Sequence, residues 1–172
     1  KMPIWIHCKG YLVRDDNMKP LYMIGCINEI GERQKADNVS GLLGESGFRE
    51  YMNQLDTPLE TGYLLRIGID HFKEINDNFG QEYGDFVLKK TAECISGCIS
   101  EGQKVYKLVA DEFLILDASS DEAQDADKLY DKVRETIDRF IETNEFKVMY
   151  TVSGGIVPFA ALKGNQCSEA LK

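Results

Sequence analysis

The sequence lacks features that would each point to a function class. No apolar run approaches the roughly 20 residues that span a bilayer, and no segment of the printed sequence has the pattern of a signal peptide. Basic residues are scarce, since 20 Lys and Arg stand against 29 Asp and Glu, for a net charge of −9. Such a surface repels the phosphates of nucleic acids, so we expect no nucleic-acid partner. We expect a cytoplasmic location, in a parent protein that is either soluble or membrane-associated.

Histidine clusters and paired cysteine motifs are also lacking. The two histidines, His7 and His71, are isolated, which leaves a histidine-based metal site or catalytic triad without support. The five cysteines (8, 26, 94, 98 and 167) are odd in number and form no CxxC motif. Cys94 and Cys98 lie one helical turn apart, so a metal or redox role is the alternative to the reduced, partly buried thiols that we expect.

The pattern of apolar and turn residues predicts an α+β fold. Residues 4–13 and 20–30 are β-rich and flank a polar turn, which predicts a hairpin, and the charged segment that follows predicts a linker helix. With 172 residues, 43% of them hydrophobic, the chain can bury a core. The remaining predicted elements are a short amphipathic helix (46–55), a strand (63–69), a helix capped by Asp70 and broken at 78–80, a longer helix (82–99), a hairpin (104–117), a helix (121–142) and a strand (148–157). This βαββαβ order makes a ferredoxin-like antiparallel sheet with helices packed on one face.

Two adjacent acids, Asp111 and Glu112, occupy the turn of the predicted hairpin 104–117. Acids at a turn between apolar strands are not core residues, and they can hold a divalent cation that grips a polyphosphate. A turn that wraps backbone amides around phosphate needs glycines before its acids, but the residues there are Val109 and Ala110. The turn therefore has the character of a nucleotide site that has been altered.

Several motifs occur in the order and spacing of one known family. They are residues 70–77 (DHFKEIND), Phe79-Gly80, Gly84-Asp85 with Leu88, and residues 109–113 (VADEF). This series resembles the GGDEF domain of diguanylate cyclases, which make cyclic di-GMP from two GTP molecules. Residues 37–42 (DNVSGL) resemble the motif at the start of that domain, and residues 152–156 (VSGGI) resemble its last central strand. The resemblance covers residues 37–172 and implies the nucleotidyl-cyclase form of the ferredoxin-like fold.

A second resemblance implies a multidomain signalling protein. Residues 5–30 resemble the last two strands of a PAS sensory domain. We therefore expect the end of a PAS domain at 1–30, the linker helix at 31–40, and a GGDEF domain at 41–172 that stops before the family's last helix. The expected partners are the adjacent domains of the parent protein, with PAS upstream and a phosphodiesterase downstream. A homodimer is left open.

The GGDEF resemblance assigns residues to a guanine nucleotide, with GTP as the ligand. Asn76 and Asp85 match the positions that hydrogen-bond guanine, because a carboxylate accepts from the N1–H and the N2 amine while an amide both donates and accepts. The backbone amides of His71, Phe72 and Lys73, at a helix N-terminus, match the turn that contacts the phosphates. The alternative is an ordinary surface Asn and an ordinary acid at a helix start.

Other positions depart from the family. Asp111 matches one ligand of the magnesium ion, but the second acid, two residues before Asp70, is replaced by Gly68. Val109 and Ala110 replace the two glycines of the signature. Both side chains add bulk where the phosphates approach, and a β-branched residue disfavours positive φ.

These departures decide the predicted function. Lys107 stands where the family usually has Arg, a milder change than the loss of a metal ligand, and residues 100–103 (SEGQ) lack the product-inhibition motif Arg-x-x-Asp. Arg66 points to the same face of its strand as Gly68, and it either offers positive charge to a phosphate or lies at the far end of that face.

Because metal ions activate the attacking hydroxyl and neutralise the triphosphate, we expect weak Mg²⁺ binding and no catalytic residue, with Glu112 as the candidate in an active enzyme. The sequence predicts a degenerate GGDEF domain that acts as a regulatory GTP-binding or interaction domain; the alternatives are an active diguanylate cyclase and a dimerisation scaffold.

Overall fold

The chain folds into two compact units, residues Lys1–Lys35 and Ala36–Lys172, and each is described by itself. The computed structural model describes residues 5–15, 17–30, 36–119, 123–144, 146–162 and 166–171. Within these ranges, no helix combines the length and the apolar character that a membrane crossing requires.

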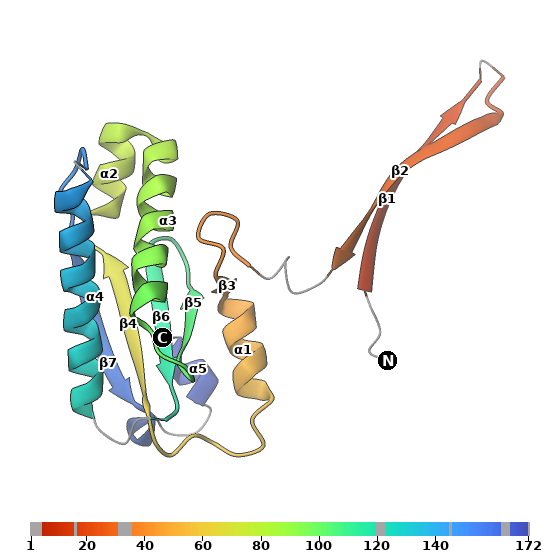
Figure 1. Ribbon diagram of the computed structural model, residues 1–172. Coiled ribbons are helices and arrows are strands. Elements are labelled where there is room, and N and C mark those ends of the chain that lie inside the picture. The colour runs from red at the N-terminus through yellow and green to blue at the C-terminus, as the bar shows by residue number, and fades with distance from the viewer. Residues whose placement is uncertain are drawn as a thin grey trace. The chain divides into compact units, whose positions relative to one another are not determined.

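The first unit is the predicted β-hairpin. Strand β1 (Trp5–Arg14) pairs antiparallel with β2 (Pro20–Ile30), as the red and orange arrows of Figure 1 show. The turn is closed by Asp15, whose Oδ1 accepts hydrogen bonds from the backbone amides of Asn17 and Lys19, both at 2.9 Å. The polar turn cluster read from the sequence therefore forms the turn by side-chain-to-backbone bonding.

The second unit is a five-stranded sheet with helices, which confirms the predicted α+β fold. The sheet order is β3-β5-β6-β4-β7, with β4 antiparallel to both β6 and β7 and with β3 parallel to β5 (Figure 1). In chain order the elements are β3 (Leu43–Gly44), α1 (Glu45–Asn53), β4 (Tyr63–Ile69), α2 (Phe72–Phe79), α3 (Gln81–Cys98), β5 (Lys104–Lys107), β6 (Glu112–Asp117), α4 (Ala123–Thr143), β7 (Val152–Pro158), the 3-10 helix η2 (Phe159–Ala161) and α5 (Gln166–Ala170).

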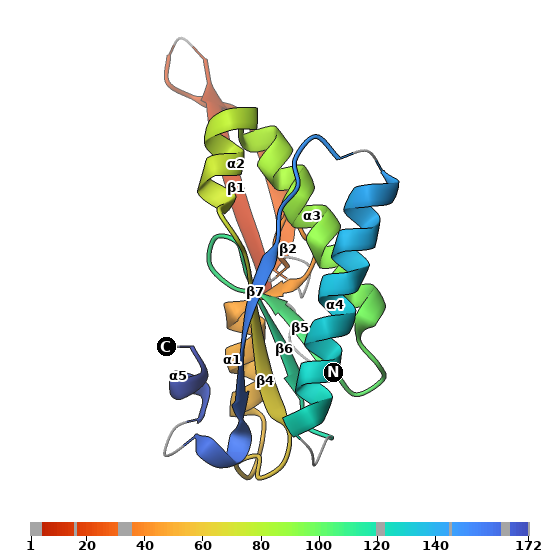
Figure 2. The same cartoon turned by 90° about the vertical axis from the view of Figure 1, so that its left-hand side faces the viewer.

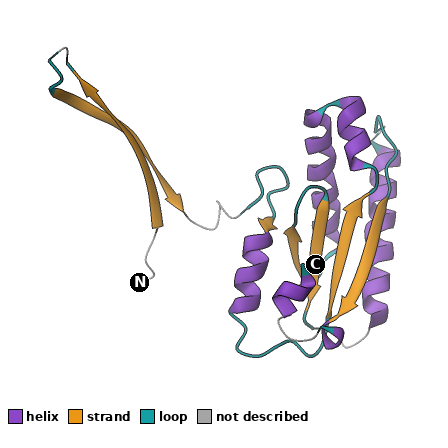
Figure 3. Cartoon of the chain, turned by 180° about the vertical axis from the view of Figure 1, so that it is seen from behind, coloured by secondary structure: helices purple, strands orange, loops and turns teal. Residues whose placement is uncertain are grey.

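Helices cover both faces of this sheet, whereas the sequence analysis placed them on one. One face, with Leu65 and Ile67 of β4, packs under α2, α3 and α4. The opposite face, with Leu64 of β4 and Leu114 of β6, packs against Phe48 of α1 and residues of α5. Figure 2 shows α5 and α4 on opposite sides of the strands, and Figure 3 shows purple helices before and behind the orange sheet. The physical reason is that the central strands are apolar on both faces, so both need a cover.

The linker helix predicted at residues 31–40 does not form in its described part, residues 36–40. Residues 31–35 lie outside the described residues, and 36–40 form a bridge and a turn in place of a helix. Asp37 closes this turn, because its Oδ1 accepts hydrogen bonds from the amide and the hydroxyl of Ser40, both at 2.7 Å. An aspartate that bonds its neighbours' backbone in this way competes with helix formation.

The hairpin between β5 and β6 (the signature hairpin, residues 104–117) has a strained residue at its tip. Ala110 has φ of 55°, in the left-handed region. The turn is closed by hydrogen bonds from the Leu108 amide to the Glu112 carbonyl, 2.8 Å, and from the Glu112 amide to the Val109 carbonyl, 3.2 Å. A side chain with Cβ at such a φ is disfavoured relative to glycine.

Replacing Ala110 with glycine is therefore expected to stabilise the protein by about 1 kcal/mol. A change of this size raises the midpoint of thermal unfolding by roughly 2–4 °C in a chain of this length, which calorimetry or circular dichroism measures. The matched control is Val109→Gly. Val109 is 71% exposed and has an ordinary φ, so glycine there only adds unfolded-state entropy and lowers the midpoint. Equal shifts of both variants would contradict the assignment of strain to Ala110.

Candidate functional site

The turn from β4 into α2 presents backbone amides at the start of a helix. His71 precedes α2 with φ of 56°, so the chain changes direction sharply at this residue. The amides of Phe72 and Lys73 lie in the first helical turn, where no intrahelical acceptor is available. The structure thus places all three predicted phosphate-contacting residues in one turn, at the positive end of a helix dipole.

Asp70 does not cap α2, and this prediction was wrong. The N-cap residue is His71, which makes no capping hydrogen bond through its side chain. The carboxylate of Asp70 instead accepts hydrogen bonds from the hydroxyls of Ser153, 2.6 Å, and Thr151, 2.5 Å. These two bonds hold the pKa of Asp70 below its usual value. Asp70 therefore fastens the β4–α2 turn to β7, the neighbouring strand.

A cavity of about 360 Å³ lies where α2, α3 and the tip of the signature hairpin meet. It brings together Asn76 of α2 and Asp85 of α3, the two predicted base-contacting residues, with Ala110 of the hairpin. Asn76 Oδ1 is buried and has no hydrogen-bond partner among the described residues. The lining residues are Phe72, Asn76, Gln81, Asp85, Leu88 and Ala110.

Gly84 positions the Asn76 amide, a role that the sequence analysis missed. A Cβ atom added at Gly84 would lie 1.9 Å from Asn76 Oδ1 and 3.3 Å from Phe72 Cζ. Any side chain at 84 would therefore displace the amide from the cavity. The sequence signal for this role is the Gly84-Asp85 motif, in which we had assigned a function to Asp85 alone. Gln81 and Leu88 also line the cavity and were not predicted to do so.

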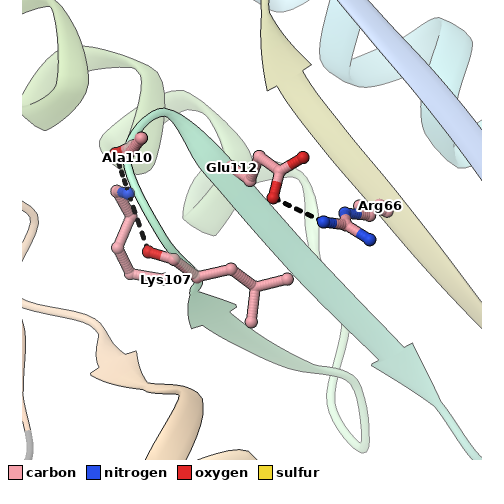
Figure 4. Close-up of polar contacts among 5 residues, drawn as sticks. Arg66, Lys107, Ala110 and Glu112 are labelled. Carbon is pink, nitrogen blue, oxygen red and sulfur yellow. Dashed lines mark hydrogen bonds and ion pairs between the residues drawn. The ribbon is translucent and has the colours of Figure 1, made fainter. Parts of the chain in front are cut away.

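The two acids of the signature hairpin lie beside Gly68, as the sequence predicted. The β4–β6 register sets Gly68 opposite Glu112, and a Cβ atom added at Gly68 would lie 4.0 Å from Asp111 Oδ2 and 4.0 Å from Glu112 Cγ. An acid at position 68 would thus complete a group of three carboxylates. Glu112 is already paired with Arg66, whose Nη2 lies 2.6 Å from its Oε2 (Figure 4).

These donors do not fit a magnesium ion. Mg²⁺ prefers oxygen ligands in a near-octahedral set, whereas Gly68 supplies no oxygen from a side chain and Arg66 holds the carboxylate of Glu112. Nowhere in the described part of the chain do three His, Cys, Asp or Glu side chains gather closely enough to hold a metal ion.

Lys107 is a buried cation that supports the tip of the hairpin. The residue is only 5% exposed, and its Nζ donates hydrogen bonds to the carbonyl of Leu108, 3.1 Å, and to that of Ala110 (Figure 4). Burial lowers the pKa of Lys107, while the charges of Asp37, Asp111 and Glu112 act in the opposite direction. The sequence predicts only a mild exchange of Lys for Arg at this position, and it carries no signal of this structural role.

The cysteines that the structure describes in full are free thiols. Cys98 and Cys167 are buried and Cys94 is half-buried. Burial raises the pKa of Cys94 to about 11, whereas a metal-binding or redox thiol needs a lowered pKa. These observations favour the reduced thiols expected from the sequence over a site at Cys94 and Cys98.

Comparison with curated proteins finds relatives in cyclic di-GMP signalling. The profile of the family described as "Diguanylate cyclase, GGDEF domain" matches residues 35–172. The chain is 29% identical over 140 residues to the cyclic di-GMP phosphodiesterase NbdA of Pseudomonas aeruginosa, a match that covers 79% of this chain and 18% of NbdA. It is 36% identical over 81 residues to the probable diguanylate cyclase DgcI of Escherichia coli, covering 46% of this chain and 18% of DgcI.

A solved structure agrees with the family assignment. The GGDEF domain of YfiN (TpbB) from Pseudomonas aeruginosa has 26% sequence identity and a TM-score of 0.63, and the match covers 79% of this chain and 81% of that structure. This chain spans less than a fifth of the length of the two curated relatives, 18% in each case. Because the family profile extends over residues 35–172, most of the sequence, the chain belongs to the GGDEF (diguanylate cyclase) domain family.

Proposed function

We propose that residues 36–172 bind GTP in a regulatory role and do not convert it to cyclic di-GMP. The observation that carries this proposal is the cavity in which Asn76 and Asp85 meet Ala110. Its volume of about 360 Å³ falls within the range of small-ligand pockets. Asn76 lines this cavity and is half-buried, with its Oδ1 enclosed beside Gly84, so the base contact that we assign to Asn76 uses the part of the residue that faces the cavity.

Guanine matches the polar groups of this cavity. Its N1–H and N2 amine are two adjacent donors, which suit a carboxylate such as Asp85, and the Asn76 amide both donates and accepts. Adenine carries an acceptor at N1, which a carboxylate repels. The amides of His71, Phe72 and Lys73 lie at the start of the same helix as Asn76, and a helix N-terminus favours phosphate. Base and phosphate contacts thus come from α2 and α3.

The catalytic part of the family's site is altered at three places. Gly68 supplies no carboxylate, Ala110 with Val109 replaces the glycine pair, and Glu112 is paired with Arg66. Electrostatic stabilisation of a transition state is worth several kcal/mol per element, and about 1.4 kcal/mol corresponds to a tenfold change in rate. The combined changes therefore reduce cyclase turnover by several orders of magnitude.

In the parent protein, GTP occupancy regulates a neighbouring domain. Matches to longer proteins named as a phosphodiesterase and as a cyclase support a multidomain parent. We place the end of a PAS domain at 1–30, a linker at 31–40 and the nucleotide-binding domain at 41–172, in the cytoplasm, with a phosphodiesterase as the downstream partner. The alternative is a domain that serves only as a homodimer scaffold, and the GTP-binding experiment distinguishes it from a regulatory GTP-binding domain.

Calorimetric titration with GTP tests the proposal. The chain is expected to bind GTP in preference to ATP, and Asn76→Ala and Asp85→Asn are each expected to weaken binding by about tenfold or more, because each removes a hydrogen-bonding group from the base. The matched controls are Asn78→Ala and Asp77→Asn, exposed residues of α2 that do not line the cavity. No heat at millimolar GTP would reject the proposal and favour the scaffold.

Incubation with GTP and Mg²⁺ is expected to give no cyclic di-GMP. The reason is that the donors at the signature hairpin do not hold the metal ions that the reaction needs. Chromatography of the products measures this, and Glu112→Gln serves as the control for contaminating activity. Turnover that Glu112→Gln abolishes would establish an active cyclase.

A further inference from the structure

Arg66 and Glu112 form an ion pair across the two central strands. The register sets Arg66 opposite Leu114 and Gly68 opposite Glu112, so Arg66 reaches diagonally past one strand position to the carboxylate. The distance from Nη2 to Oε2 is 2.6 Å, and the two side chains are 37% and 35% exposed (Figure 4). The guanidinium of Arg66 therefore contacts Glu112, the residue that lies directly opposite Gly68 in the register.

Stability alone does not explain an arginine at this position. A partly exposed ion pair adds little to stability, and Arg66 Nε is buried without a hydrogen-bond partner in the described structure. Leaving a buried donor unsatisfied is unfavourable. The neighbours on this face include Leu64 and Leu114, beside which an apolar residue avoids that cost. What arginine adds at position 66, compared with an apolar residue, is therefore its positive charge.

The charges around the hairpin are largely compensated within the chain. Asp111 and Glu112 flank Gly68, Arg66 is paired with Glu112, and Lys107 lies among the charges of Asp37, Asp111 and Glu112. A divalent cation beside Glu112 would meet the guanidinium, which repels it and already holds the carboxylate. Asp111 alone is a poor site, because hard cations need several oxygen ligands.

We propose that the Arg66 guanidinium takes the place of a divalent cation at the signature hairpin, so that guanine nucleotide binds here without a metal ion. The second half of this statement rests on the proposed GTP binding, whereas the first half does not. Arg66 neutralises Glu112, which would otherwise repel the phosphates, and it does so permanently. Nucleotide occupancy then follows GTP concentration and not the supply of magnesium.

Titration with Mn²⁺ alone tests the replacement without any nucleotide. Mn²⁺ takes oxygen ligands as Mg²⁺ does, and the electron paramagnetic resonance signal of the free ion reports binding. The double variant Arg66→Leu with Gly68→Asp removes the internal cation and adds the third carboxylate. It is expected to bind Mn²⁺ at least about tenfold more tightly than the wild type, as a site with three carboxylates and no guanidinium should. Equal affinity in both proteins would overturn the proposal.

Two further variants keep this test decisive. Arg49→Leu removes a different ion pair of the same 2.6 Å length, to Glu45 on α1, and is expected to leave Mn²⁺ binding at the wild-type level. Arg66→Leu alone is expected to bind Mn²⁺ more tightly than the wild type even if the double variant does not fold. An equal gain in Arg49→Leu would show a general charge effect and overturn the assignment to Arg66.

The nucleotide half is tested by GTP titration in excess EDTA and in Mg²⁺. The wild type is expected to differ by less than about threefold between the two conditions, whereas Arg66→Leu loses about tenfold or more in EDTA and recovers in Mg²⁺. Arg66→Lys, which keeps a cation, is expected to behave as the wild type. Wild-type binding that needs Mg²⁺ would overturn this half. Absence of GTP binding in every condition would reject the proposed function, while the Mn²⁺ titration still decides the role of Arg66.

Discussion

The antiparallel pairing of β4 with β6 is the interaction on which both the core and the site depend. Its register sets Ile67 opposite Phe113 and Gly68 opposite Glu112. Because side chains alternate between the faces of a strand, the first pair enters the core under α2, α3 and α4, while the second lies on the opposite face of the sheet together with Arg66. A slip of one residue would send Ile67 to the site and Gly68 to the core. The strong burial of Ile67 and Phe113, both 0% exposed, therefore also fixes the charges of the site.

The cavity depends on a different constraint, the close approach of α2 to α3. Gly80 ends α2 with φ of 85°, which lets α3 begin at the next residue and turn back beside it. Gly84, one turn into α3, has no side chain, and this leaves room for the Asn76 amide. The two glycines thus act differently, one through backbone conformation and one through space. Asn76 and Asp85 face a common cavity only because both conditions hold.

Much of this architecture could be predicted from local patterns, and the errors at the candidate site share one cause. Residues 63–69 were predicted as a strand and form β4 with the same bounds, because a continuous apolar run followed by a polar turn is a strong local signal. The failures concern choices between distant partners. Asp70 has local amides to cap, yet it bonds the hydroxyls of Ser153 on β7 and of Thr151, the residue before β7. Likewise, the partner of Arg66 depends on a register that no local pattern records.

The same geometry supports the proposed separation of guanine binding from catalysis. Asn76 and Asp85 are held by helix packing, whereas the acids of the signature hairpin are held by strand pairing. The two parts meet at Ala110, which lines the cavity and forms the hairpin tip. A Cβ atom at Gly68 would meet only ordinary van der Waals contacts, at 4.0 Å, so exchanging an acid for glycine there changes charge with little change in packing. An arginine two positions along the same strand then restores neutrality at Glu112. Under the proposed function, a loss of metal ligands at the sheet therefore leaves the cavity between the helices intact.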